Sequence, residues 1–210
     1  MLSWLPVHLR HDLPLLMRKV FQIGFNKCGT TSFHILFERS GYRSIHWDEG
    51  RLARSILANA DAHRPLLEGY ESYTCFLDME WLTDTTVVAI YLTHYQQLDR
   101  EYPGSRFILN TRNCDTWIAS RLRHKNFANR FQRIHRQTTG DVIETWKSEW
   151  IRHHADVKAY FAQRPESLLI YDIDKDRIDK LRAFLPEFDF PGDALPHENR
   201  TAERPCGTKS

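Results

Sequence analysis

Cysteine, net charge and long hydrophobic runs are all scarce in this sequence. Its 210 residues include four cysteines, which lie far apart and form no C-x-x-C pair. A disulfide framework is therefore not expected, and a reducing, cytoplasmic location fits best. The 29 Lys and Arg residues nearly balance the 27 Asp and Glu residues, for a formal net charge of +2. A nucleic-acid partner is not expected, because such proteins usually carry a marked basic excess.

No hydrophobic run is long enough to predict a membrane span. The apolar residues near the N-terminus are interrupted by Arg10, His11 and Asp12 before a signal-peptide core could form. An organelle lumen is the alternative location if an N-terminal anchor has been removed. A metal site is not predicted either, because the adjacent His153 and His154 point to different sides of a helix.

The composition fits one hydrophobic core. With 41% hydrophobic residues, the chain can bury one sizeable core but is short for two ordinary domains. We predict a single domain over residues 1–210, with an N-terminal extension at 1–18 and a C-terminal loop or tail at 195–210. No heptad or apolar stripe indicates an oligomeric state.

Short apolar runs alternate with segments of helical periodicity. This alternation predicts an α/β fold with a central parallel sheet flanked by helices, in which ligands bind at the carboxyl ends of the strands. Strands are predicted at residues 20–23, 42–46, 73–77, 106–111 and 167–171. Helices are predicted at residues 33–40, 52–59, 87–98, 115–123, 141–161 and 178–184.

The first predicted strand leads into the segment GFNKCGTTS at residues 24–32. Gly24 and Gly29 have the spacing of a P-loop, in which backbone N–H groups and the dipole of the next helix hold phosphate. A three-layer P-loop-like fold is therefore predicted. The lysine departs from the P-loop pattern, because it lies inside the loop at Lys27 and Thr30 follows the second glycine.

The position of Lys27 favours a particular chemistry. A nucleotide kinase needs its lysine on the outer phosphates and a hydroxyl on Mg²⁺, whereas sulfuryl transfer needs a cation at the oxygen that joins sulfur to the leaving phosphate. Negative charge grows on that oxygen as the S–O bond breaks, so a preorganised ammonium stabilises the transition state. Taken alone, the loop could also be a glycine turn with a solvated lysine.

A second candidate anion site follows the strand at residues 106–111. Arg112 lies at the end of this strand and can form a two-pronged contact with a phosphate, and Ser120 follows eight residues later on a predicted helix. Taken alone, Arg112 could form a surface ion pair with Asp115 or a neighbouring carboxylate, and Ser120 could lie on a solvated helix face.

Three features together resemble the sulfotransferases that use 3'-phosphoadenosine 5'-phosphosulfate (PAPS). They are the loop GFNKCGTTSF, the segment RNCDTWIAS and the order of strands. The ending LRAFL followed by LPHENRT is similar to that of a small sulfotransferase-like branch. The resemblance implies PAPS as co-substrate and 3'-phosphoadenosine 5'-phosphate (PAP) as product, with no obligatory metal.

The resemblance also implies cofactor-binding residues. Arg112 and Ser120 would bind the 3'-phosphate, and Arg200 in the LPHENRT segment is a further candidate. The first loop would bind the phosphosulfate through Asn26, Lys27, Cys28, Gly29, Thr30, Thr31 and Ser32.

The general base is the least determined part of the predicted site. Relatives that act on sugar chains often carry a glutamate after the second strand, but Ser44 stands in its approximate place. His46 is favoured because its ordinary pKa lies near neutrality, although it could simply form a hydrogen bond inside the sheet. The other catalytic candidates are Asp48 and Glu49 after this strand, and Asp78 and Glu80 after the strand at residues 73–77. The segment from Asp78 to Trp81 could equally cap a helix.

The sequence is also compatible with other functions. A nucleotide kinase and a nucleotide-binding relative without turnover are the alternatives to a sulfotransferase. The acceptor would be a sugar or small-molecule hydroxyl. The basic stretch at residues 121–125 could contact an anionic ligand or form a solvated surface.

Overall fold

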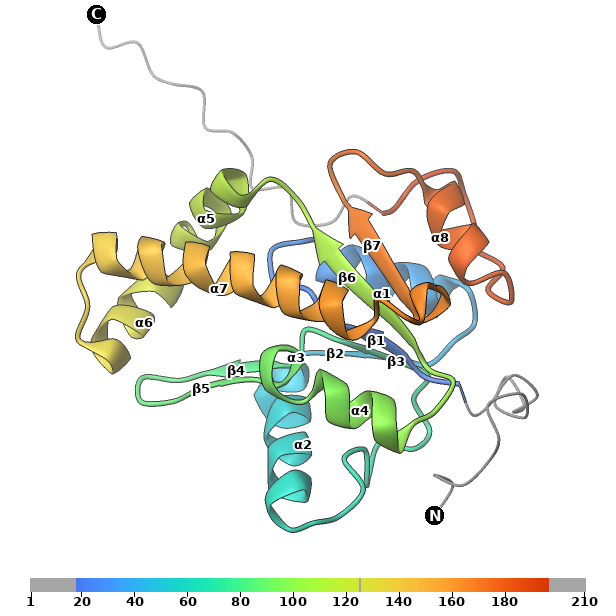
Figure 1. Cartoon of the computed structure of the whole chain (residues 1–210), viewed down its shortest axis with the longest axis horizontal. Helices are drawn as coiled ribbons and strands as arrows, with labels where there is room; N and C mark the ends of the chain where they lie inside the picture. The colour runs from blue at the N-terminus through green and yellow to red at the C-terminus, as the bar shows by residue number, and fades with distance from the viewer. Residues whose placement is uncertain (1–17, 125, 197–210) are drawn as a thin grey trace, which may run out of the picture.

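The computed structural model describes residues 18–124 and 126–196. Its centre is a five-stranded sheet in the order β2-β3-β1-β6-β7, with every neighbouring pair parallel (Figure 1). The strands are β1 (Val20–Gln22), β2 (Ser44–His46), β3 (Cys75–Leu77), β6 (Arg106–Thr111) and β7 (Leu168–Asp172). Because all five strands run the same way, their carboxyl ends meet at one edge.

Helices cover both faces of the sheet, as predicted for an α/β fold (Figure 1). Helices α1 (Thr30–Arg39) and α8 (Ile178–Phe184) cover one face. The remaining α-helices are α2 (Arg51–Asp61), α3 (Ile90–Thr93), α4 (Tyr95–Glu101), α5 (Cys114–Leu122), α6 (Phe127–His135) and α7 (Thr139–Tyr160). Two 3₁₀ turns are η3 (Asp48–Gly50) and η4 (Pro165–Ser167).

Alternate residues of the strands enter different hydrophobic clusters. In β6, Phe107 and Leu109 pack with the α2 to α7 side, whereas Ile108 between them packs with α1 and α8. Side chains of successive strand residues point to opposite faces, so a sheet covered on both sides needs apolar residues at consecutive positions. This explains why the strands read as short continuous apolar runs.

The structure corrects two predictions about local structure. Residues 87–98 were predicted to be helical throughout, but β5 (Val87–Ala89) pairs antiparallel with β4 (Glu80–Leu82) before α3 begins. Short apolar runs fit either period, and the pairing across the hairpin decides between them. Helix α6 was not predicted, because its segment is rich in arginine and only Phe127, Ala128 and Phe131 are buried.

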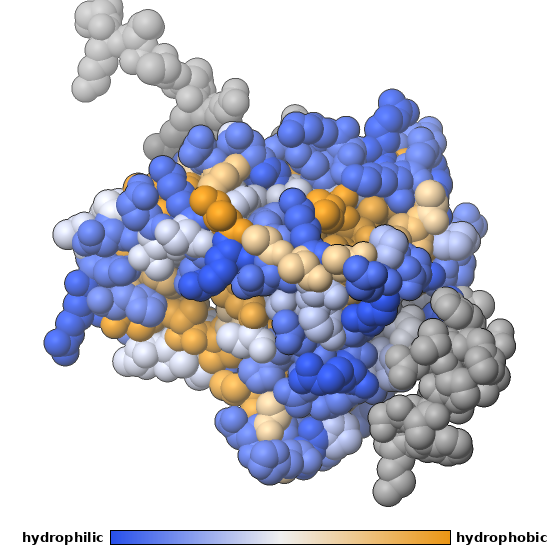
Figure 2. All heavy atoms as spheres, viewed as in Figure 1, coloured by the Kyte–Doolittle hydropathy of each residue, from blue (hydrophilic) through white to orange (hydrophobic). Residues whose placement is uncertain are grey.

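Hydrophobic side chains emerge at several separate places on the face shown in Figure 2, among them the region between α7 and the β4–β5 hairpin. Polar residues cover most of the rest. No helix within the described ranges is long and apolar enough to cross a membrane. The predicted extension and tail fall almost entirely outside those ranges.

Candidate functional site

The loop between β1 and α1 packs tightly against the end of β6. A Cβ atom on Gly24 would lie 2.0 Å from the backbone oxygen of Asn110, so only glycine fits there. Lys27 and Gly29 have φ angles of 63° and 78°, which turn the chain sharply before α1. Left-handed residues of this kind let successive N–H groups point into one concavity.

Side chains from β6 and α5 bind the carbonyl groups of the loop from outside. Buried Asn110 accepts a hydrogen bond from the Gly24 N–H at 2.9 Å, and its amide donates to the oxygens of Phe25 (3.2 Å) and Cys28 (2.9 Å). The indole of Trp117 donates to the oxygen of Asn26 at 3.0 Å. These contacts fix the loop with its carbonyl groups already engaged.

The backbone N–H groups on the other side of the loop are not bound in this way. Within the described residues, the backbone N–H groups of Cys28, Gly29 and Thr30 have no hydrogen-bond acceptor. Among these residues, the buried Oδ1 of Asn26 also has no hydrogen-bond partner. Helix α1 begins here, so its positive dipole end adds to the donors. The arrangement is suited to an anion.

The other predicted loop residues surround this point. Thr30 and Ser32 are buried and Thr31 is half-buried. Burial raises the pKa of the Cys28 thiol, so this side chain packs as a neutral group in the core. Cys28 can therefore contribute only its backbone to a ligand.

Lys27 lies among polar groups from neighbouring elements. Its Nζ is 3.5 Å from Nδ1 of His124, which follows α5. Its positive charge is also close enough to the Asp78 carboxyl to lower the pKa of that group. The predicted catalytic lysine and one predicted base are thus neighbours.

Arg112 joins the loop to the end of the next strand. Its Nη1 donates to the Lys27 oxygen at 3.4 Å and its Nη2 to Oδ1 of Asp174 at 3.2 Å. Its acidic partner is Asp174, a neighbouring carboxylate, and not Asp115. Ser120 is half-buried on α5, three residues after Trp117, so both residues share a helix face beside the loop. Arg200 lies outside the described residues.

His46 ends β2 and contacts the start of α1. Its Nε2 is 3.0 Å from Thr30 Oγ1 and 3.5 Å from Asp78 Oδ2. Burial lowers the pKa of His46 to about 4, so the imidazole is neutral at pH 7 and its contact with Asp78 is not an ion pair. The neighbouring His34 stacks on it and binds Ser44 Oγ at 2.9 Å.

Asp78 follows β3 with a φ angle of 50°. Burial raises the pKa of its carboxyl to about 6, although Lys27 and Arg121 act in the opposite direction. The side chain keeps 16% of its surface exposed. No helix begins at this turn: Glu80 opens strand β4, which rules out the helix-cap reading of this segment.

Asp48 lies on a turn after β2 in which Trp47, Asp48 and Glu49 all have positive φ angles. Its carboxylate pairs with Arg51 at 2.6 Å. Asp48 therefore faces Arg51 at the surface, whereas His46 and Asp78 face each other. Trp47 is 48% exposed at the same turn.

Two features of the site were not found from the sequence. One is Asn110, which the sequence reading placed only inside a strand. The other is a buried ion pair between Glu80 Oε1 and Arg121 Nη2 at 2.9 Å. Arg121, the first residue of the basic stretch at 121–125, is buried and does not belong to a solvated surface. No spacing rule links residues so far apart along the chain.

The described residues contain no group of three or more His, Cys, Asp or Glu side chains that could hold a metal ion.

One family comparison agrees with the fold, with the loop after β1 and with Arg112 at the end of β6. A model described as a sulfotransferase domain matches residues 19–126. The chain belongs to the sulfotransferase family, and its α/β fold fits that assignment. A comparison with curated proteins gave no significant match.

Proposed function

We propose that this protein transfers the sulfuryl group of PAPS to the hydroxyl of a sugar or small molecule and releases PAP. The observation that carries the proposal is the loop after β1. Its carbonyl groups are bound from outside by Asn110, Trp117 and Arg112, while N–H groups and the start of α1 are left to bind an anion.

The residues near this loop fit a nucleotide that carries phosphate groups at both the 5' and the 3' position of its ribose. We infer that residues 26–32 hold the phosphosulfate and that Arg112 and Ser120 bind the 3'-phosphate. Arg112 now pairs with Asp174, and a phosphate would compete for the same guanidinium. Arg200 stays a prediction. Lys27, Arg112 and the loop amides supply the positive charge, so no obligatory metal is proposed.

Lys27 has the central role in the proposed transfer. Bound PAPS supplies an activated sulfuryl group whose leaving group is a phosphate. The bond from sulfur to that phosphate breaks while a bond to the acceptor oxygen forms. We infer that the Lys27 ammonium stabilises the negative charge that develops on the leaving oxygen.

Asp78 is the proposed acceptor of the proton that the hydroxyl loses. Its pKa of about 6 makes it ionised but still basic at neutral pH, and it lies partly exposed beside Lys27. His46, the residue favoured from the sequence, has a pKa of about 4 and contacts Thr30. We infer that His46 orients Asp78 and Thr30, and that Asp48 takes no part because Arg51 binds it.

We also infer that the chain forms a single sulfotransferase domain, because both hydrophobic clusters pack on the same sheet.

The proposed sulfuryl transfer is tested by incubating the full chain with radiolabelled PAPS and panels of sugar, phenol and other hydroxyl acceptors. Label in an acceptor product is expected. Transfer of labelled phosphate from ATP, with none of sulfate from PAPS, would contradict the proposal and favour a kinase.

A further inference from the structure

The Glu80–Arg121 ion pair lies deep behind the proposed site. The two side chains are only 5% and 3% exposed, and Nη2 of Arg121 donates to Oε1 of Glu80 at 2.9 Å. Both ions lose their hydration on burial, so such a pair adds little net stability compared with apolar side chains. Stability alone does not account for it.

Arg121 is held rigidly in place. Its guanidinium carbon lies 4.4 to 5.1 Å from the centres of three aromatic rings. The rings belong to Trp117 on α5, Phe127 on α6 and Trp146 on α7. A planar guanidinium stacked on aromatic rings has little freedom to move, and its charge is stabilised by their faces. Arg121 therefore provides a fixed cation near the carboxyl edge of the sheet.

Glu80 connects this cation to the turn at Asp78. Its own N–H donates to the Asp78 oxygen at 2.8 Å, and the N–H of Ile90 donates to the Met79 oxygen at 3.0 Å. The positive φ angle of Asp78 is unfavourable for an aspartate by itself. By binding Glu80 two residues later, Arg121 fixes the end of this turn.

Charged and titratable groups surround Asp78 from several elements. Arg121 is a cation that acts on both carboxyls, and Glu80 is an acid that Asp78 itself influences. Burial raises the pKa of Glu80, and the Arg121 guanidinium acts in the opposite direction. The groups are Lys27 of the loop, His46 of β2, Glu80 of β4, Tyr91 of α3, Arg121 of α5 and Glu149 of α7.

We propose that Glu80 and Arg121 form a positioning pair: they fix the turn that holds Asp78 beside Lys27 and bring the Arg121 cation to the same turn. The proposal rests on the proposed function only for the catalytic role of Asp78. The charge of Asp78 can be measured without any ligand.

The test is a pH titration of the full chain labelled with carbon-13 aspartate, followed by NMR, with the Asp78 resonance assigned from Asp78→Asn. Arg121→Gln removes the cation and keeps an N–H donor for Glu80. The Asp78 midpoint is expected to move upward by about 0.5 to 1 pH unit. The matched control is Arg164→Gln, which removes the cation of an ion pair that links α4 to the segment before β7, and should leave the midpoint unchanged.

An unchanged Asp78 midpoint in folded Arg121→Gln would overturn the proposal. If Arg121→Gln does not fold, Arg121→Met removes the cation but keeps an apolar side chain against the three rings, and the same upward shift is required. PAP calorimetry on the same samples separates this result from the proposed function. Absence of PAP binding by the unaltered chain would count against the sulfotransferase mechanism, whereas the titration would still decide the role of the pair.

Discussion

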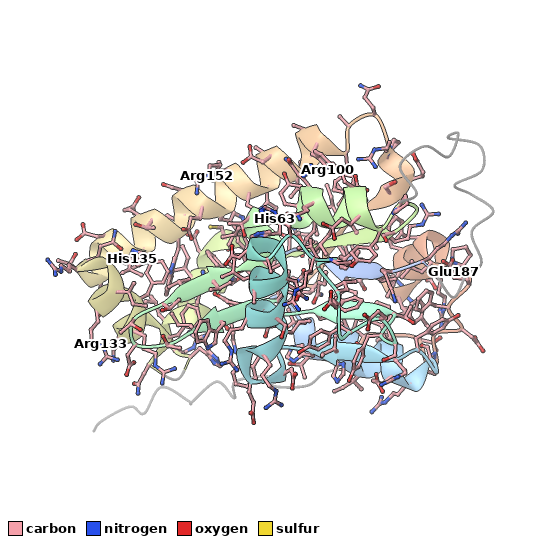
Figure 3. The ribbon with its side chains drawn as sticks, turned by 90° about the horizontal axis from the view of Figure 1, so that it is seen from below. His63, Arg100, Arg133, His135, Arg152 and Glu187 are labelled. Carbon is pink, nitrogen blue, oxygen red and sulfur yellow. The ribbon has the colours of Figure 1, made fainter. Side chains whose placement is uncertain are left out.

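The two edges of the central sheet differ in which residues adopt left-handed backbone conformations. In the connections that lead into β2, β3 and β6, Gly41, Gly69 and Gly104 have positive φ angles. The exception is His63, which is labelled after the end of α2 in Figure 3. After the carboxyl ends of β1, β2 and β3, residues with side chains adopt them in addition to Gly29 and Gly50. These residues are Lys27, Trp47, Asp48, Glu49 and Asp78.

This difference separates a stable edge from a strained one. A left-handed conformation costs a residue with a side chain about 1 to 2 kcal/mol, a cost that glycine avoids. The carboxyl edge therefore gives up stability to hold Lys27 and Asp78 in fixed positions. Strain of this kind concentrates at functional sites, because the surrounding structure must impose it.

The largest effect is expected from Lys27→Met. Removing the ammonium should lower sulfuryl transfer from PAPS by about 100- to 1,000-fold, because charge on the leaving oxygen loses its stabilisation. Folding, measured by circular dichroism, should be retained. Lys158→Met, on the exposed face of α7, is the matched control and should transfer at the normal rate. Near-normal turnover by Lys27→Met would remove this residue from catalysis and end the functional contrast between the edges.

Asp78→Asn tests the second strained residue. The rate of the unaltered protein should rise with pH through about 6 and then level off, because a base acts only when deprotonated. Asp78→Asn should lower the rate by about 100-fold at neutral pH and abolish this rising limb. The measurement is a pH–rate profile of both proteins. If Asp78→Asn keeps the limb while His46→Gln loses it, the base is His46.

Asn110→Ala compares the site with an ordinary buried amide. It should reduce the free energy of unfolding by about 2 to 3 kcal/mol and weaken PAP binding, since Gly24, Phe25 and Cys28 lose their partner. Asn59, whose amide donates to two backbone oxygens after α2, provides the control. Urea denaturation should show a loss for both variants, and calorimetry should show weaker PAP binding for Asn110→Ala alone. Equal PAP affinities would mean that Asn110 is not needed to shape the loop.

The smallest effect concerns strain itself. Glu49→Gly should stabilise the protein by about 0.5 kcal/mol, because relief of the left-handed strain exceeds the added flexibility of the unfolded chain. Glu144→Gly, on the exposed side of α7, should instead destabilise it by about 1 kcal/mol. Urea denaturation of both variants makes the comparison. A loss of stability at Glu49 would show that this turn is not strained.

The predictable part of the molecule was local along the chain. The spacing of Gly24 and Gly29, the apolar strand runs and Arg112 at a strand end are all short patterns, and the family match over residues 19–126 agrees with them. The roles of Asn110 and Arg121 were not predictable in this way. Asn110 binds a loop more than 80 residues earlier, and Arg121 pairs with a residue 41 positions away. Such contacts depend on which strands and helices become neighbours.

The sequence also could not predict which of the candidate residues is better suited to act as the general base. His46 and Asp78 have ordinary pKa values that favour the histidine at neutral pH. Burial changes both values in opposite directions, lowering the pKa of His46 to about 4 and raising that of Asp78 to about 6. Desolvation depends on how the folded protein buries each side chain, and a sequence motif does not show this.

The most direct test of the central claim is titration calorimetry of the full chain with PAP and with ATP, each in the presence and absence of Mg²⁺. The account predicts that PAP binds more tightly than ATP, without a requirement for Mg²⁺. It also predicts that Arg112→Ala weakens the binding of PAP more than that of adenosine 5'-phosphate, which lacks the 3'-phosphate. Preference for ATP with Mg²⁺ over PAP would contradict the assignment of the carboxyl edge to sulfuryl transfer.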